Sequence, residues 1–242
     1  MIAAALIPAA GRGQRMGLEV EKQFMPLAGK LLLAHTLARF EATAGIDHIV
    51  VIVPPGREAF CARHIVEAEG FRKVIHIVAG AETRQGSVAA GFRCLGENVD
   101  VIVIHDGARP LVSPSLIQTS IELAFQHGSA LVAIPESDTL KRVSVEGTVL
   151  ETVDRRNLWR AQTPQAFRRS ILQRALAHAE EFKLDMTDEA SLVEACSSPI
   201  HVIPGSMWNF KVTTTDDLRL AELLLAQHDD GGSAGQHTWE RG

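Results

Sequence analysis

The sequence has few cysteines and no long apolar run. Its three cysteines, Cys61, Cys94 and Cys196, are widely separated, odd in number and without a CxxC pair, which argues against a disulfide framework or a zinc knuckle. The opening MIAAALIPAAGRGQRMG has only a short apolar stretch with no basic segment before it, far from the roughly 20 residues of a membrane span. We therefore predict a cytoplasmic protein in a reducing compartment, with no membrane partner.

The chain also lacks an excess of positive charge. It has 24 basic and 29 acidic side chains, a net charge of −5, which argues against bulk electrostatic binding to nucleic acid. A polyanionic substrate would need positive charge concentrated locally. With 242 residues, of which 46% are hydrophobic, the chain is large enough for a substantial core.

Short, continuous apolar runs alternate with segments of helical spacing. Helical spacing begins near Leu31, Leu116 and Leu172. Continuous apolar strands are typical of a parallel sheet covered on both faces. The fold class predicted is α/β, a single Rossmann-like domain over residues 1–227 with a mainly parallel twisted sheet flanked by helices, and ligands at the edge where strands run into helices. The predicted strands are Ala3–Ile7, Ile49–Val53, Val74–Val78, Val101–Ile104, Ala130–Ile134 and Ile200–Ile203.

Residues 136–160 break this alternation. Valines on both sides of Glu146-Gly147 predict two strands joined by a tight turn, and an isolated ribbon of this kind is barely stable. A second copy of the chain is the simplest surface for this arm to pack on, and its own sheet is the alternative. The polar, glycine-rich residues 228–242 predict a frayed tail.

A glycine-rich loop follows the first predicted strand. In PAAGRGQRMG, small residues let backbone N–H groups approach a phosphate, and Arg12 and Arg15 add charge. The loop lacks the Gly-Lys-Ser/Thr of a Walker A motif, and Met16 replaces the third glycine of a dinucleotide fingerprint. We predict a polyphosphate cradle over which Lys22 folds back; an ordinary turn is the alternative. The residues predicted to form the cradle are Ala9, Ala10, Gly11 and Gly13.

A second polar cluster, HDGARP, follows the strand that ends at Ile104. Asp106 would lie at the ligand edge of the sheet, where its carboxylate suits Mg²⁺ or the hydroxyls of a ribose or substrate, and the sequence leaves these roles open. Arg109 would orient or neutralise a substrate, or pair with Asp106. His105 is interpreted as a packed strand residue.

Taken in order, these blocks resemble a known family. PAAGRGQRM, GAETRQGSV, HDGARP, DTLKR, TVDRRNLWRAQTPQAF, TDEAS and NFKVTTTDDL, over about residues 3–223, are similar to the 2-C-methyl-D-erythritol 4-phosphate cytidylyltransferase family. The resemblance implies a homodimer with exchanged arms that transfers CMP from CTP to a polyol phosphate, with Mg²⁺ or another divalent cation. Ribitol-5-phosphate cytidylyltransferases are a close alternative; a non-catalytic nucleotide-binding protein and an NAD-linked oxidoreductase are more distant ones.

The resemblance also implies roles near the nucleotide. Arg15 and Lys22 would stabilise the transition state. Gly80 and Ala81 would contact cytosine through their backbone, and the Ser87 hydroxyl would add a contact or, alternatively, cap the following helix.

The polyol phosphate would be bound by residues from two subunits. The resemblance implies that Thr139, Arg155 and Thr163, on or next to the arm, reach it from the neighbouring subunit, while Lys211 belongs to the home subunit. A solvated Arg155 is the alternative. TDEAS is interpreted as structural, with Thr187 as a helix N-cap. Glu21, where the family usually has proline, would slightly weaken phosphate binding.

Overall fold

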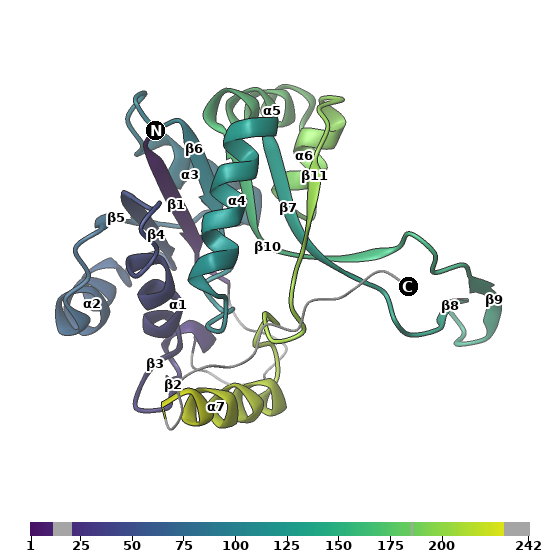
Figure 1. Ribbon diagram of the computed structural model, residues 1–242, viewed down its shortest axis with the longest axis horizontal. Coiled ribbons are helices and arrows are strands. Elements are labelled where there is room, and N and C mark those ends of the chain that lie inside the picture. The colour runs from purple at the N-terminus through teal and green to yellow at the C-terminus, as the bar shows by residue number, and fades with distance from the viewer. Residues whose placement is uncertain (12–20, 185, 230–242) are drawn as a thin grey trace.

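A seven-stranded sheet lies at the centre of the fold (Figure 1). The computed structural model describes residues 1–11, 21–184 and 186–229. All six predicted strands are present, with bounds that differ from the predicted ones by at most one residue at either end, so this part of the prediction is confirmed. In spatial order the strands are β11 (His201–Pro204), β7 (Ser129–Pro135), β10 (Trp159–Arg168), β6 (Val101–Ile104), β1 (Ala3–Pro8), β4 (His48–Val53) and β5 (Val74–Ala79).

The sheet is parallel except for β10. β1 pairs in parallel with β4 and β6, β4 with β5, and β11 with β7, whereas β10 runs antiparallel between β6 and β7. The sequence did not predict β10, because its start was assigned to the arm and few of its residues are β-branched. Gln165 of β10 pairs with Ile104 of β6, and continuing that register by two residues sets Thr163 opposite Asp106.

Helices cover both faces of the sheet, as predicted. The two core clusters share β1 alternately, Ala3, Ala5 and Ile7 with one face and Ala4 and Leu6 with the other, which explains why its apolar run is continuous. One cluster takes in α1 (Leu32–Glu41), α2 (Glu58–Cys61) with the π-helical η3 (Ala62–Glu67), and α4 (Pro114–His127). The other takes in α3 (Arg84–Arg93), α5 (Arg169–Phe182) and α6 (Glu189–Ala195).

A third, smaller hydrophobic cluster lies beyond the carboxyl ends of the parallel strands, at the bottom of Figure 1. Here α7 (Thr215–Asp229) packs Ala221 and Leu225 on Leu27 and Val212. The short hairpin β2 (Pro26–Leu27) and β3 (Lys30–Leu31) and the 3-10 helix η2 (Lys22–Phe24) adjoin it. Across the described ranges, no helix has the length and apolar character to cross a bilayer. Of the predicted tail, residues 230–242 lie outside the described residues.

The arm projects from the sheet beyond β7 and β10 (Figure 1). β8 (Leu140–Val143) and β9 (Val149–Val153) pair antiparallel as a separate ribbon, with Gly147 at φ +85° in the turn, so the predicted hairpin is confirmed. The alternative of packing on its own sheet is wrong, because β8 and β9 pair with each other alone in the described sheets. Trp159 and Arg160, assigned to the arm from the sequence, pair with β7 instead.

Candidate functional site

A cleft of about 460 Å³ opens at the carboxyl ends of β1, β5 and β6, the edge predicted from the strand order. Five segments of the chain supply its lining. The lining residues are Pro8, Ala9, Ala10, Gly11, Lys22, Gln23, Ala81, Glu82, Thr83, Arg84, Ser87, Asp106, Gly107, Ala108, Lys211 and Thr213. Most of the residues predicted to bind nucleotide therefore share one concave surface.

The loop between β5 and α3 is held by side chains from its own helix. The Ser87 hydroxyl accepts a hydrogen bond from the Ala81 N–H at 3.0 Å and donates to the Thr83 carbonyl at 2.9 Å. The helix N-cap is Thr83, which accepts from the Gly86 N–H, so the alternative of Ser87 as a cap is wrong. Ser87 thus shapes the loop that lines this side of the cleft.

Two backbone groups of the predicted nucleotide site are already used by the sheet. The Ala9 N–H donates to the Ile52 carbonyl at 2.7 Å, and the Gly80 N–H donates to the Val53 carbonyl at 2.8 Å. These bonds extend the sheet pairing past the strand ends and fix both loops against β4. The predicted contacts of Ala9 and Gly80 with a ligand would therefore have to use their carbonyls or Cα atoms.

Gly80 cannot carry a side chain without moving its neighbours. A Cβ atom there would lie 2.4 Å from Ala10 Cβ and 2.9 Å from Ser87 Oγ, closer than packed atoms approach. We expect Gly80→Ala to push the two loops apart, to raise the KM for the nucleotide that the resemblance implies about tenfold and to lower the free energy of unfolding by about 1–3 kcal/mol. Steady-state kinetics and chemical denaturation measure both effects.

Gly96→Ala is the matched control for Gly80→Ala. Its Cβ would meet the end of the Asn98 side chain, which can rotate away. We expect an unchanged KM for this variant, and an unchanged KM in Gly80→Ala as well would contradict the packing explanation.

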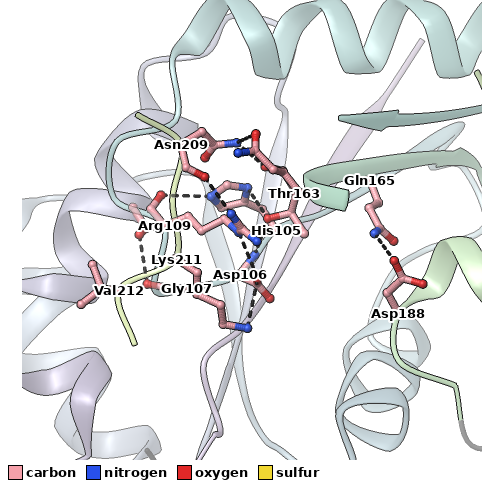
Figure 2. A network of polar contacts seen from close by, with 12 residues as sticks. His105, Asp106, Gly107, Arg109, Thr163, Gln165, Asp188, Asn209, Lys211 and Val212 are labelled. Atoms are coloured by element: carbon pink, nitrogen blue, oxygen red, sulfur yellow. Dashed lines mark hydrogen bonds and ion pairs between the residues drawn. The ribbon is translucent and has the colours of Figure 1, made fainter. Parts of the chain in front are cut away.

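Asp106 is the centre of charge in the cleft (Figure 2). Its carboxylate lies 3.1 Å from Arg109 Nε, 3.1 Å from Lys211 Nζ and 3.6 Å from Arg84 Nη2. Burial disfavours the ionised form, but Lys211, Arg109 and Arg84 outweigh it and hold the Asp106 pKa well below its usual value. Asp106 thus gathers three cations beside the cleft, an arrangement that suits an anionic ligand.

Arg84 lines the cleft, although sequence reasoning assigned it no role. Its guanidinium donates to Glu189, which is fully buried at the start of α6. Burial raises the Glu189 pKa, while Arg84 opposes that shift. The α6 N-cap is Asp188, which accepts from the Ser191 N–H at 3.0 Å, so the predicted cap Thr187 is wrong by one residue. The TDEAS block therefore also supports a cleft cation.

Lys22 lies in the cleft beside the segment that carries Lys211. Its Nζ donates to the Val212 carbonyl at 3.0 Å. Glu21, expected to weaken phosphate binding, forms an ion pair with Arg57 at 2.7 Å, and this partner offsets its charge. The other predicted residues of the glycine-rich loop, Arg12, Gly13 and Arg15, lie outside the described residues.

Thr163 lies in the sheet and not on the arm. Its hydroxyl accepts from the Asp106 N–H at 3.1 Å and lies 3.0 Å from His105 Nδ1 (Figure 2). β10 places Thr163 behind Asp106 of its own chain, and its expected contact with the polyol phosphate of a neighbouring subunit stays a prediction. His105 is fully buried, as interpreted from the sequence, and burial lowers its pKa to about 4.

The two arm residues are not brought to this cleft. Thr139 and Arg155 are exposed, and neither lines it. Arg155 donates to the Ser137 carbonyl at the base of the arm. Within one chain, the structure therefore unites the predicted site residues of the described core but leaves those of the arm apart.

Comparison with known proteins assigns the chain to a family. The family model described as 2-C-methyl-D-erythritol 4-phosphate cytidylyltransferase matches residues 3–227. The chain belongs to this family. It is thus a nucleotidyltransferase enzyme, as the motif order predicted.

Individual members of the cytidylyltransferase family agree with this assignment. A relative of that name from Geotalea uraniireducens is 46% identical over 225 residues, covering 91% of this chain and 95% of the relative. Another from Alkaliphilus metalliredigens is 43% identical over 235 residues, covering 97% and 96%. The crystal structure of the Thermus thermophilus enzyme is 33% identical, with a TM-score of 0.78 over 93% of this chain and all of that one.

Proposed function

We propose that this protein transfers the cytidylyl group of CTP to 2-C-methyl-D-erythritol 4-phosphate and releases pyrophosphate, a step of isoprenoid precursor synthesis. The observation that supports it best is the cleft in which Arg84, Arg109 and Lys211 converge on Asp106, in a chain of this family. Cationic side chains at the carboxyl edge of a parallel sheet suit two phosphate-bearing reactants.

The reaction requires neutralisation of the phosphate charges and alignment of the two reactants more than it requires proton transfer. The attacking phosphate oxygen is already ionised, and it displaces pyrophosphate from the α-phosphorus of CTP, so no protein nucleophile is required. Lys22 would approach the phosphates as a movable point charge. The small residues Ala10 and Gly11 leave room for the triphosphate, and Arg15, outside the described residues, is proposed as a second cation there.

On the acceptor side, Asp106 and Lys211 carry complementary functions. The Asp106 carboxylate accepts hydrogen bonds from substrate hydroxyls, while Lys211 and Arg109 attract the phosphate. The charge pattern also suits a polyol phosphate over a neutral sugar. An oxidoreductase using NAD has no support from the cleft, whose loop lacks the dinucleotide fingerprint.

We propose that the enzyme works as a homodimer in which each arm completes the other subunit's cleft. The arm exposes Val143, Val145, Val149 and Leu150, an apolar set unusual for a free ribbon in water. Thr139 and Arg155 are then presented away from their own chain, where a neighbour's acceptor phosphate would meet them.

The described residues do not fit a metal ion held by the protein. Asp106 lines the cleft, and both of its oxygens face cations. Over residues 1–11, 21–184 and 186–229, no group of three acidic, histidine or cysteine side chains is placed to share an ion. We therefore propose that Asp106 is not a metal ligand and that Mg²⁺ enters as a companion of CTP.

The three described cysteines are free thiols. Cys61 is buried, and burial raises its pKa to about 12, which keeps it unreactive. We propose a reducing, cytoplasmic location on this ground.

Pyrophosphate release measured with purified protein tests the proposed function. With CTP and Mg²⁺, we expect turnover of 2-C-methyl-D-erythritol 4-phosphate to exceed that of ribitol 5-phosphate at least about tenfold in kcat/KM. A reaction without polyol phosphate is the blank. Faster turnover of ribitol 5-phosphate would assign the chain the alternative substrate, and no turnover of either would contradict the proposal.

A further inference from the structure

A chain of buried hydrogen bonds runs beneath the Asp106 turn (Figure 2). We propose that His105 and Thr163 are positioning residues that set the orientation of Asp106 and Arg109. The inference rests on the proposed function, because the kinetic tests below use the proposed reaction.

The hydrogen-bond partners fix the direction of each proton in this chain. His105 Nε2 lies 3.1 Å from the Arg109 carbonyl oxygen, which can only accept, so Nε2 carries the hydrogen. Nδ1 of the neutral ring is then an acceptor, and the Thr163 hydroxyl donates to it at 3.0 Å. The same hydroxyl accepts from the Asp106 N–H at 3.1 Å. Its proton and one lone pair are thereby used inside the protein.

The two ends of the turn are held by one imidazole ring. Through Thr163 the ring contacts the backbone of Asp106, and through Nε2 it contacts the backbone of Arg109. The ring is fully buried and packs on Phe40, with 5.0 Å between ring centroids. A ring fixed in this way prevents the turn from shifting relative to the sheet.

Thr163 also connects the turn to the segment that carries Lys211. Its carbonyl accepts from Asn209 Nδ2 at 2.7 Å, and the Asn209 carbonyl accepts from Arg109 Nη1 at 2.7 Å. Asn209 is 1% exposed, and Lys211 follows two residues later. The Asp106–Arg109 and Asp106–Lys211 ion pairs are therefore built on one hydrogen-bonded frame.

Thr163 and His105 lie behind the lining of the cleft. Thr163 is 3% exposed, His105 is 0% exposed, and neither lines the cleft, whereas Asp106, Gly107 and Ala108 do. The hydroxyl lies on the protein side of Asp106, where it supports the backbone that substrate-binding groups need. Misplacement of reacting groups by about 1 Å can cost on the order of a hundredfold in rate, so this support has kinetic consequences.

Thr163→Val, His105→Phe and their combination test this proposal. We expect each single variant to lower kcat/KM for the polyol phosphate by about 30- to 100-fold, with the KM for CTP changed less than about threefold. Because the two side chains act through one hydrogen bond, the double variant should lose no more than the worse single variant. Thr163→Ser keeps the hydroxyl and should stay within about threefold of wild type.

Thr43→Val is the matched control for stability. Thr43 is a buried threonine, 2% exposed, whose hydroxyl donates to the Arg39 carbonyl. We expect it to lower Tm with kinetics unchanged, which separates a positioning role from a general loss of stability. If His105→Phe fails to fold, His105→Gln takes its place, because it keeps a donor for the Arg109 carbonyl and loses the acceptor for Thr163.

Three results would overturn the proposal. They are a His105 variant with unchanged kinetics, losses that multiply in the double variant as for an independent substrate contact, and a Thr163→Val variant whose loss matches that of Thr43→Val. The ¹⁵N spectrum of the histidine rings gives a readout independent of turnover. It should show His105 with its hydrogen on Nε2 and none on Nδ1 in the wild-type protein. The opposite tautomer would contradict the proposed hydrogen bonds even if the enzyme were active.

Discussion

Lys22→Ala is expected to lower kcat by about 10²- to 10³-fold while the KM for CTP rises less than about tenfold. Lys22 lines the cleft beside the loop that follows β1, and its charge is most valuable when negative charge accumulates around the α-phosphorus. An interaction that strengthens in the transition state affects kcat more than ground-state binding. Steady-state and single-turnover assays of pyrophosphate release measure the separation.

Lys73→Ala is the control for this variant. Lys73 also donates from Nζ to a backbone carbonyl, that of Thr43 at 2.7 Å, but it does not line the cleft. Its removal should leave turnover near that of wild type. An unchanged kcat in Lys22→Ala would contradict the role of Lys22 in the transition state. A higher KM for CTP with an unchanged kcat would restrict Lys22 to binding the nucleotide.

Mixing Arg155→Ala chains with Lys22→Ala chains is expected to restore activity that neither possesses alone. If the arm crosses to its neighbour, one cleft of each mixed dimer has an intact Lys22 from its own chain and an intact Arg155 from its partner. Random reassembly then recovers about a quarter of wild-type sites, against losses of about a hundredfold in each parent. Pyrophosphate release after unfolding and refolding the mixture measures the recovery.

Arg142→Ala supplies the control on the arm. Arg142 is an exposed arginine of β8 that pairs with Glu151, and it should tolerate substitution. Absence of recovery in mixed dimers, verified with two differently tagged chains, would show that Arg155 acts in its own subunit or not at all.

Apolar periodicity predicted most of the scaffold. Continuous runs such as Val101–Ile104 are buried on both faces, so their pattern in the sequence follows directly from their place between two helical layers. The turn at Glu146-Gly147 was equally predictable, because Gly147 adopts a positive φ that few other residues tolerate. At these positions the local sequence was sufficient to predict the structure.

Pairing between distant segments was harder to predict. β10 has no run of β-branched residues, and without it nothing in the sequence sets Thr163 opposite Asp106. The same applies to Arg84 and Glu189, which form an ion pair across 105 positions of the chain. The alternative role of Ser87 as a helix cap failed for a local reason: two hydroxyls, at Thr83 and Ser87, compete for the start of one helix, and only geometry decides between them.

The base of the arm is closed by a hydrogen bond from the Glu136 N–H to the Leu158 carbonyl, directly beyond the pairing of Pro135 with Trp159. The sheet therefore ends in the same way whatever the length or sequence of the segment beyond this bond. Because the entropic cost of closing a loop grows only slowly with its length, insertions and deletions in the arm are cheap for the fold. The arm can therefore vary in length and sequence during evolution, and the residues that it offers to the acceptor substrate can change with little effect on the nucleotide cleft.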